Sequence, residues 1–291
     1  MATPAAEVDI DEALVRALLV AQRPDLADLP VRVVANGWDN TVVRLGDQLM
    51  ARLPRRAAAA DLIVHEQRWL PVLAPLLPIA VPVPEFVGAP SDDYPWTWSV
   101  GRWLPGRSAA EAPPLDPAET ADQLGAFVHA LHRPAPPDAP ANPYRGVALA
   151  ERAAAVEGRV TALADRLDAH RTLATWHELL HTEPWDGPPL WLHGDLHPSN
   201  MLTLDGRLSA VIDFGDLTAG DPATDMAVAW MLFDAPHRER FRLAAEIDTH
   251  TWRRAAGWAL NLSLAYLTGD DSTSMPAIGR ATLTAVLDEF G

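Results

Sequence analysis

The sequence predicts an α+β protein of two lobes: a small antiparallel β lobe with helices, then a larger, mainly helical lobe. Short β-like runs separated by turn residues fill most of residues 31–103, helical patterns fill most of the remainder, and no internal repeat interrupts this order. At roughly 100–200 residues per domain, the 291 residues form one large domain or two lobes. We place the boundary so that the lobes are residues 1–103 and 104–291.

The small lobe is expected to begin with an amphipathic helix. Asp9 and Glu12 have the spacing of a capping box, apolar residues recur behind them at helical period, and prolines end the pattern. A second helix is expected over Ala57–Leu70 and ends at Pro71. Gly46-Asp47 suits a tight hairpin turn between two of the strands. The predicted strands are Val31–Ala35, Thr41–Leu45, Gln48–Leu53, Ala80–Val87 and Trp96–Trp103.

The larger lobe opens with a helix that Asp116 caps and that runs to about His132. The five prolines of Arg133–Tyr144 predict an extended loop. Asp205-Gly206 predicts the turn of a β-hairpin that pairs Asn200–Thr203 with Leu208–Ile212. Further helices are expected over Ala148–Leu167, Thr172–Thr182, Pro222–Phe233, Trp252–Leu267 and Met275–Phe290.

The composition excludes several kinds of chemistry. All 23 basic residues are arginine, and the chain has no lysine and no cysteine. It therefore has no lysine-containing phosphate-binding loop, no Schiff-base lysine, no thiolate nucleophile and no cysteine metal site. The net charge of −16 argues against binding to nucleic acid or to an acidic membrane surface. The N-terminus has neither a basic region nor an apolar core, so we expect no signal peptide and a location in the cytosol of a bacterium.

The strongest functional signal lies between Trp191 and Asp225. Asp195 and Asn200 are five positions apart on a loop that enters the predicted hairpin, and Asp213 follows its second strand. Because a tight hairpin brings its ends together, Asn200 and Asp213 can converge on one Mg²⁺ ion, which prefers such oxygen ligands and borrows others from substrate phosphates. Asp195, outside that metal shell, is placed to receive the proton of an attacking hydroxyl.

These motifs, H-G-D-x-x-x-x-N followed by I-D-F-G, resemble the catalytic and metal-binding loops of the aminoglycoside phosphotransferase family. The resemblance implies a protein-kinase-like bilobal fold whose first lobe binds the nucleotide and whose second carries the catalytic loop and acceptor site. It implies Asp195 as the catalytic base and Asn200 and Asp213 as ligands of Mg²⁺. Asp225 resembles the buried carboxylate that ties down the family's catalytic loop.

The expected nucleotide site lies in the small lobe. Kinases hold the α- and β-phosphates with a strand lysine paired to a helix glutamate. Here the corresponding position is Arg52 with Glu66 as its partner, which resembles the macrolide phosphotransferase branch; arginine can bridge phosphate and carboxylate, with a different geometry. Asn36 and Gly37 lie where a nucleotide-covering loop belongs, and the carbonyl of Arg102 with the amide of Leu104 would read the base.

Other interpretations of these residues remain at this stage. His193, Asp195 and His197 also fit a fragment of a metallohydrolase, which the order and spacing of Asn200 and Asp213 disfavour. We interpret His193 as a packed loop histidine, whereas His197 either orients phosphate or is exposed. Arg55 and Arg56 are expected to face solvent, although either could reach a phosphate.

The sequence therefore predicts a Mg²⁺-dependent kinase that transfers the γ-phosphoryl group of ATP or GTP to a hydroxyl of an antibiotic-like acceptor, an aminoglycoside or a macrolide. The alternatives are a metabolic kinase for an amino alcohol or sugar, and a catalytically degenerate nucleotide-binding homologue. A cationic acceptor would suit the acidic residues of the larger lobe, although most of these are expected to be solvated. They are Asp216, Asp234, Glu246, Asp248, Asp270 and Asp271. Trp230, Trp252 and Trp258 either line an apolar acceptor pocket or pack in the core.

Overall fold

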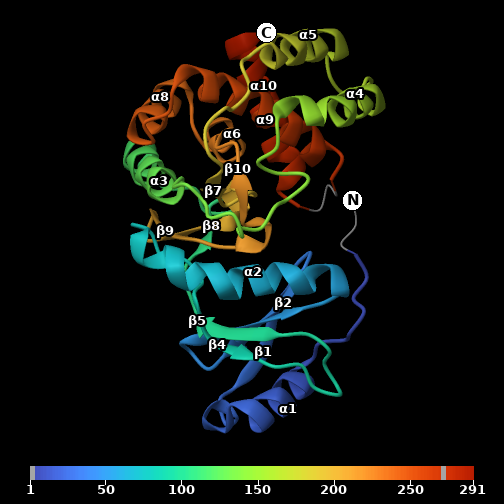
Figure 1. The fold of residues 1–291 in the computed structure, drawn as a ribbon, viewed down its shortest axis with the longest axis vertical. Coiled ribbons are helices and arrows are strands. Elements are labelled where there is room, and N and C mark those ends of the chain that lie inside the picture. The colour runs from blue at the N-terminus through green and yellow to red at the C-terminus, as the bar shows by residue number, and fades with distance from the viewer. Residues whose placement is uncertain (1–3, 270–272) are drawn as a thin grey trace.

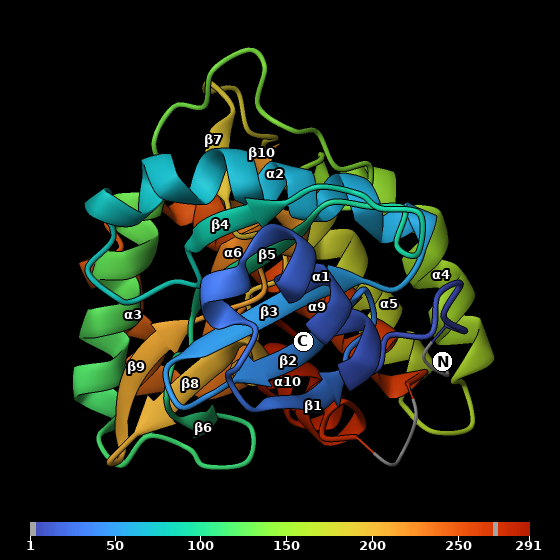
Figure 2. The ribbon, with the colours of Figure 1, turned by 90° about the horizontal axis from the view of Figure 1, so that it is seen from below.

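The computed structural model describes residues 4–269 and 273–291 and shows two lobes (Figure 1). In the small lobe, helix α2 lies between the β-sheet and the larger lobe, and α1 covers the opposite side of the sheet (Figures 1 and 2). The elements of this lobe are α1 (Glu12–Gln22), β1 (Val31–Asn36), β2 (Asn40–Leu45), β3 (Leu49–Pro54), α2 (Ala57–Leu73), β4 (Pro84–Gly88) and β5 (Trp98–Arg102).

The sheet of the small lobe has the strand order β1-β2-β3-β5-β4 and all its neighbouring strands are antiparallel. Strands β2 and β3 form the predicted hairpin, in which Gly46 adopts a positive φ of 55°. Apolar side chains of the central strands alternate toward α1, so that Val43, Leu45 and Leu53 are fully buried against Leu19. This core is separate from that of the larger lobe.

The larger lobe is mainly helical, as predicted. Its helices are α3 (Pro117–Leu131), α4 (Ala153–Ala162), α5 (Ala169–Leu180), α6 (Ala223–Met226), α7 (Ala229–Leu232), α8 (Ala235–Ala244), α9 (Thr249–Leu267) and α10 (Met275–Phe290). Its strands are β6 (Arg107–Ser108), β7 (Leu190–Leu192), β8 (Met201–Leu204), β9 (Arg207–Val211) and β10 (Thr218–Gly220).

Helix α9 is the central element of the larger lobe. It is buried along most of its length and packs against α4, α5, α6 and α10. Trp230, Trp252 and Trp258 all lie in this core, which confirms the packing interpretation of the three tryptophans. Leu70 and Leu73 of α2 also join the core of the larger lobe, so α2 connects the two lobes by packing as well as by position.

Several boundaries differ from those predicted. Asp11, and not Asp9, caps α1, because its carboxylate accepts a hydrogen bond of 2.8 Å from the amide of Leu14. Pro71 lies inside the last turn of α2, which continues to Leu73. The strand expected from Ala80 starts only at Pro84, because the prolines of this segment cannot donate to a β-ladder.

Other elements of the larger lobe were not expected from the sequence. Strands β7 and β10 pair with each other although they are far apart in the chain. Helix α8 also went unpredicted, although Asp234 caps it and Pro236 occupies its first turn. The expected helix Ala148–Leu167 is shorter, and that over Pro222–Phe233 is divided into α6 and α7.

The proline-rich segment Arg133–Tyr144 is a loop, as predicted, and the rest of the lobe fixes its path. The amide of Ala135 donates to the carbonyl of Pro189, and the hydroxyl of Thr218 donates to the carbonyl of Pro140. The loop therefore runs beside β7 and β10 and brings the residues that follow it close to the loop between β7 and β8.

None of the helices in the described parts of the chain combines the length and the apolar character that crossing a membrane requires.

Gly125 provides a test of the close packing between α3 and α8. A Cβ atom at this buried position would lie 2.5 Å from the Cβ of Ala244 and 3.0 Å from the carbonyl oxygen of Phe241. We expect Gly125→Ala to lower the free energy of unfolding by about 1–3 kcal/mol, because overpacking outweighs the gain in helix propensity. Urea unfolding of both proteins measures the difference.

Gly158→Ala is the matched control, since Gly158 is exposed on α4 and a Cβ there meets nothing within 4 Å. This variant should be more stable than the parent by about 0.5–1 kcal/mol. Equal effects at both positions would contradict the packing argument.

Candidate active site

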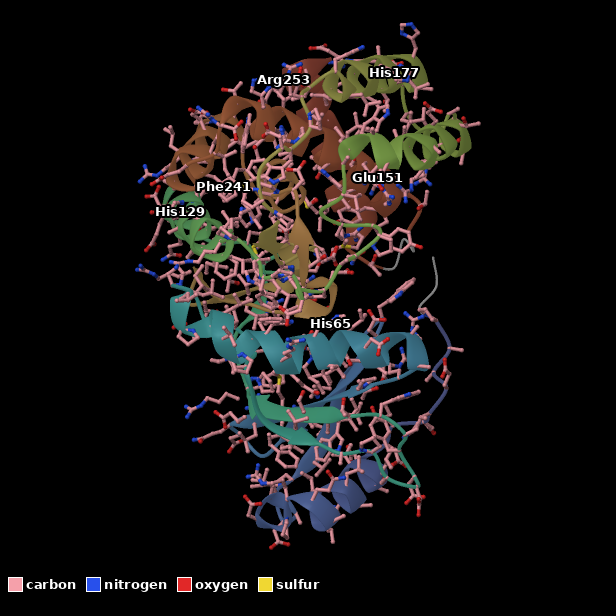
Figure 3. The ribbon with its side chains drawn as sticks, in the orientation of Figure 1. His65, His129, Glu151, His177, Phe241 and Arg253 are labelled. Carbon is pink, nitrogen blue, oxygen red and sulfur yellow. The ribbon has the colours of Figure 1, made fainter. Side chains whose placement is uncertain are left out.

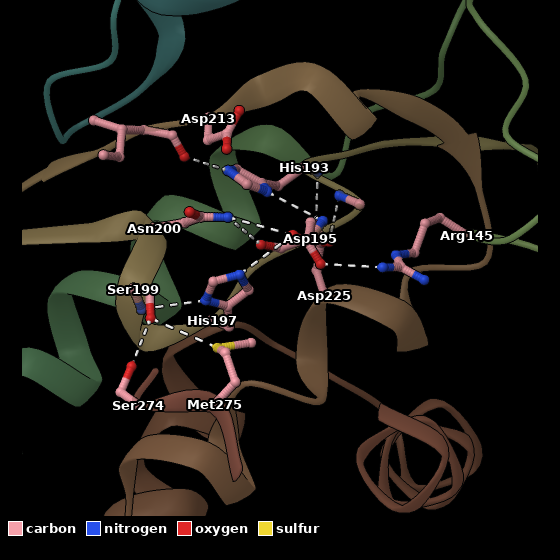
Figure 4. Close-up of polar contacts among 12 residues, drawn as sticks. Arg145, His193, Asp195, His197, Ser199, Asn200, Asp213, Asp225, Ser274 and Met275 are labelled. Carbon is pink, nitrogen blue, oxygen red and sulfur yellow. Dashed lines mark hydrogen bonds and ion pairs between the residues drawn. The ribbon is translucent and has the colours of Figure 1, made fainter. Parts of the chain in front are cut away.

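The catalytic loop between β7 and β8 is held in shape by Asp225. This fully buried carboxylate accepts a hydrogen bond of 2.8 Å from the amide of His193 (Figure 4). It also accepts one of 2.9 Å from the amide of Gly194 and lies 3.1 Å from Nε2 of His132. Gly194 has a φ of 85°, and a Cβ atom there would come within 2.2 Å of the carbonyl oxygen of Asp216. The prediction that Asp225 ties down the loop is confirmed.

The two histidines of the loop have distinct positions and the same tautomer. Nδ1 of His193 accepts from the amide of Asp195, so its Nε2 donates to the carbonyl of Ile212 at 3.0 Å. Nδ1 of His197 accepts from the amide of Ser199, so its Nε2 faces the carboxylate of Asp195 at 3.3 Å. His193 is the packed loop histidine we predicted; His197 is neither exposed nor free to orient phosphate, because it is buried against Asp195.

Asp195 lies at the centre of a set of polar contacts. Its Oδ1 accepts a hydrogen bond from Arg145 at 3.1 Å, and the side-chain nitrogen Nδ2 of Asn200 donates to the backbone carbonyl of Asp195 at 3.0 Å (Figure 4). Burial raises the pKa of Asp195, but His197 and Arg145 outweigh burial and hold the pKa well below its usual range. The carboxylate is therefore ionised at neutral pH and ready to accept a hydrogen bond.

Asn200 and Asp213 lie at the two ends of the β8–β9 hairpin and line the same cavities. Because the Asn200 nitrogen donates to Asp195, its oxygen is turned away from that contact, and the Asp213 side chain is 54% exposed. Asp213 also has a φ of 64°, a strained backbone conformation for a residue with a side chain. An amide oxygen and an open carboxylate fit Mg²⁺ as a donor set. No group of three or more His, Asp or Glu residues arranged for a metal occurs in the described chain.

Arg52 joins the two lobes at this site. From β3, its guanidinium contacts the buried carboxylate of Glu66 on α2 and donates to Oδ1 of Asp213 at 3.2 Å. Burial raises the pKa of Glu66 to about 7, against the opposing effect of Arg52. The structure thus brings together the pair expected in place of the kinase lysine and glutamate.

The loop between β1 and β2 covers the site from the small lobe. Arg55 donates to the carbonyl of Gly37 at 2.7 Å, and Arg56 forms an ion pair of 2.7 Å with Asp39. Both arginines are partly exposed, as expected, and in addition both hold the loop in place. The side chain of Asn36 accepts a hydrogen bond from the hydroxyl of Thr41. Among the described residues, Gly37 lines both of the cavities that Asn200 and Asp213 border, whereas Asn36 lines neither.

Two cavities meet at Asn200 and Asp213. One, of about 330 Å³, lies between the lobes and has mostly apolar walls from β1, β2, β3 and β8, with Arg52 on one side. The other, of about 840 Å³, lies on the larger lobe around Asp195. Trp38 and Asp39 border both, so the β1–β2 loop lies over the junction of the two cavities.

The segment that connects the lobes forms one edge of the smaller cavity. Trp103 and Leu104 line this cavity. The Arg44 guanidinium lies 4.1 Å from the centre of the Trp103 ring, and the Trp103 amide donates to the carbonyl of Gln48. The side chain of Arg102 is exposed and pairs with Glu85, away from the cavity. Only its main chain could therefore take part in reading a base, as the sequence argument assumed.

The larger cavity contains residues that the sequence analysis missed. Arg145, Arg159 and Tyr266 line it, together with Asp216, which accepts from Asn142 at 2.6 Å. Of the other acidic residues considered, Asp234 and Asp248 cap α8 and α9, and Asp270 and Asp271 lie outside the described residues. Arg145 directly follows the proline-rich loop, and Arg159 and Tyr266 lie on helices, so no local motif marks any of the three.

The comparisons with known proteins agree with this geometry. A sequence model described as the phosphotransferase enzyme family matches residues 30–258, and the chain belongs to that family. It is thus an enzyme of the phosphotransferase class, and the resemblance seen in the sequence is confirmed. No curated protein matches the chain.

Solved structures of similar fold include antibiotic phosphotransferases. A mutant of aminoglycoside 2'-phosphotransferase-IIIa with GDP is 21% identical with a TM-score of 0.72, over 97% of this chain and 99% of that one. Macrolide 2'-phosphotransferase type I is 20% identical with a TM-score of 0.64, over 99% of both chains. Macrolide 2'-phosphotransferase MphH from Brachybacterium faecium is 22% identical with a TM-score of 0.62, over 94% of this chain and 97% of that one. The kinase-like bilobal fold is therefore confirmed.

Asp225→Asn tests the support of the catalytic loop. An amide at this position presents an N–H group to the loop amides, so we expect a loss of about 2–4 kcal/mol in the free energy of unfolding at pH 7. Burial opposes ionisation of Asp225, but hydrogen bonds and the neighbouring histidines lower its pKa below the usual value. Its stabilisation is therefore complete above about pH 4, the value in the unfolded chain, and is lost as the pH falls through the lower native pKa.

Urea unfolding of the parent and of Asp225→Asn between pH 7 and pH 3 measures this dependence. The gap between the two proteins should narrow below about pH 4. A gap that stays constant over the whole range would show that Asp225 does not stabilise the loop as a carboxylate.

Proposed function

We propose that this protein is a Mg²⁺-dependent small-molecule kinase that transfers the γ-phosphoryl group of ATP or GTP to a hydroxyl group of its acceptor. The observation that carries the proposal is the junction of the two cavities, where Asn200 and Asp213 border a nucleotide-sized slot on one side and the Asp195 cavity on the other. Membership of the phosphotransferase enzyme family supports the same reaction class.

In this proposal the nucleotide occupies the smaller cavity. The base would lie between the apolar side chains of Val42 and Leu202, with its edge toward the main chain near Leu104. Arg52, already oriented by Glu66, would donate to the α- and β-phosphates. Main-chain groups near Gly37 would cover the phosphates.

Asn200 and Asp213 would hold Mg²⁺, which when bound neutralises charge on the β- and γ-phosphates. Asp195 accepts the hydrogen bond of the acceptor hydroxyl and directs its oxygen toward the γ-phosphorus. A new oxygen–phosphorus bond then forms as the bond to the β-phosphate oxygen breaks, the hydroxyl proton passes to Asp195, and the nucleoside diphosphate leaves. Because the pKa of Asp195 is lowered, the carboxylate acts mainly by orientation and takes the proton late in the transfer.

For the acceptor, the fold favours an antibiotic-like molecule, since structures of similar fold include a streptomycin and ATP complex of an aminoglycoside phosphotransferase as well as the macrolide phosphotransferases. A second candidate is a small metabolic hydroxyl compound, which the two arginines of the larger cavity favour over a polycation. The third alternative, a degenerate nucleotide-binding homologue, is disfavoured because Arg52 is placed to substitute for the missing lysine.

Asp195→Asn tests the proposed base. We expect kcat to fall by about 10²- to 10⁴-fold, because an amide cannot accept the hydroxyl proton, while the KM for the nucleotide changes little. A coupled assay of nucleoside diphosphate release, run over aminoglycosides, macrolides and metabolic alcohols, measures this. Asp205→Asn, at the exposed turn of the same hairpin, is the control; turnover that survives in Asp195→Asn would remove Asp195 from the mechanism.

Arg52→Lys tests whether the arginine has a function of its own. A lysine is a single point of charge and cannot reproduce the fork that contacts Glu66 and Asp213 together. We expect kcat/KM for the nucleotide to fall by about 10- to 100-fold, equivalent to one charge-assisted hydrogen bond. Arg32→Lys, exposed on β1, should leave the kinetics unchanged. An Arg52→Lys enzyme with the kcat/KM of the parent would show that only the positive charge at position 52 matters.

A further inference from the structure

The larger cavity contains an arginine for which the described residues supply no carboxylate partner. Arg159 extends from α4 into this cavity, and its guanidinium donates to the side-chain oxygen of Asn261 on α9 at 2.9 Å. No Asp or Glu in the described chain lies within ion-pair distance of Arg159. Because Asn261 is neutral and accepts one hydrogen bond, most N–H donors of Arg159 remain available to a ligand.

The neighbourhood of Arg159 is positively charged. Burial lowers the pKa of Arg159, and repulsion from Arg145 and Arg152 lowers it further. Arg145 is balanced by Asp195, whereas Arg152 donates to the carbonyl of Pro143. Of these three arginines only Arg145 has a carboxylate contact among the described residues, so the charge of Arg159 in the cavity wall is left unbalanced, which costs free energy in the empty protein.

The acidic residues of the cavity do not balance this charge. Asp39 pairs with Arg56, and Asp213 pairs with Arg52, so both are already compensated from the small lobe. Asp216 accepts from the side-chain amide of Asn142 and attracts Arg145, while burial and repulsion from Asp195 raise its pKa. Asp195 and Asp216 therefore both compensate Arg145, and neither forms an ion pair with Arg159.

Tyr266 adds a neutral donor to the same wall. Its ring packs edge-on against His197, 6.0 Å between centres, and its hydroxyl is buried with no hydrogen-bond partner among the described residues. A buried hydroxyl of this kind is normally satisfied, so its position in the cavity wall indicates a ligand that accepts its hydrogen bond.

We propose, on the basis of the kinase function above, that the acceptor carries an anionic group, a carboxylate or a phosphate, near the reacting hydroxyl and that Arg159 binds this group. The anion balances Arg159 and its arginine neighbours and accepts from Tyr266. The hydroxyl of the same molecule then reaches Asp195. A polycation would meet Arg159 and Arg145 across the cavity and bind poorly.

Direct anion binding provides the first test. With the nucleotide slot filled by Mg²⁺ and a non-hydrolysable ATP or GTP analogue, sodium phosphate and sodium acetate are titrated by calorimetry at constant ionic strength. We expect one or both to bind, with an affinity at least about 10-fold weaker in Arg159→Gln and largely restored in Arg159→Lys. The anion that binds more tightly, phosphate or acetate, identifies the anionic group of the acceptor as a phosphate or a carboxylate.

Arg253→Gln is the matched control. Arg253 pairs with Glu178 on the far end of the larger lobe, away from the junction of the lobes (Figure 3). This variant should bind the anions as the parent does. Anion binding that is absent from the parent, or equal in the parent and Arg159→Gln, overturns the proposal. Thermal melts show whether each variant is folded.

Matched acceptors provide the second test. L-Serine and ethanolamine share a hydroxyl and an ammonium group and differ by one carboxylate; gluconate carries a carboxylate where sorbitol has a hydroxymethyl group. We expect kcat/KM to favour the member that carries the carboxylate by at least about 10-fold, and Arg159→Gln to abolish this preference through KM. Turnover of kanamycin or of a neutral acceptor that Arg159→Gln leaves unchanged overturns the proposal while the kinase function stands. Anion binding that depends on Arg159, without turnover of any hydroxyl compound, supports the anion site and overturns the kinase function.

Discussion

The contact of Arg52 with Glu66 and Asp213 is the interaction on which the arrangement of the active site depends. It is made by one residue from β3, one from α2 and one from the turn after β9, so that a single guanidinium joins the sheet, its helix and the larger lobe. Arg52 and Glu66 are both buried, so removing the guanidinium would leave the Glu66 carboxyl group without its partner in an apolar setting. The slot between the lobes therefore has its width and its charge fixed before any nucleotide enters.

The catalytic loop is fixed by a second, independent set of contacts. Asp225 holds the amides of His193 and Gly194, and the two histidines then use both ring nitrogens, one for a loop amide and the other for Ile212 or Asp195. Because each ring accepts at Nδ1, its tautomer is determined by the fold and its Nε2 always donates. The carboxylate of Asp195 is thus oriented at Oδ2 by Nε2 of His197 and at Oδ1 by Arg145.

The sequence was sufficient for those parts of the site that lie close together in the chain. Asp195, Asn200 and Asp213 lie on one loop and the hairpin that follows it, and Asp225 comes soon after on α6, so the spacing in the sequence predicts their arrangement. The Arg52–Glu66 pair could also be predicted, because strand and helix follow each other directly. The pairing of β7 with β10 and the delivery of Arg145 by the proline-rich loop depend on long-range packing. No local pattern encodes such contacts, since their partners are chosen by the whole core. Helix α8 had its cap in the sequence, but its charged residues obscured the apolar period.

The absence of lysine acquires a more specific meaning from these contacts. A lysine at position 52 would supply one ammonium group, whereas the arginine reaches two carboxylates at once and still has donors in the plane of its fork. Arginine also keeps its positive charge at all physiological pH values. In the larger cavity this charge cannot be removed by deprotonation, so another group must balance it. Arg145 forms an ion pair with Asp195, whereas Arg159 has only the amide of Asn261 as a side-chain partner among the described residues. In a chain whose every basic side chain is a permanent cation, an unbalanced arginine in a cavity wall indicates the charge of the molecule that fills the cavity.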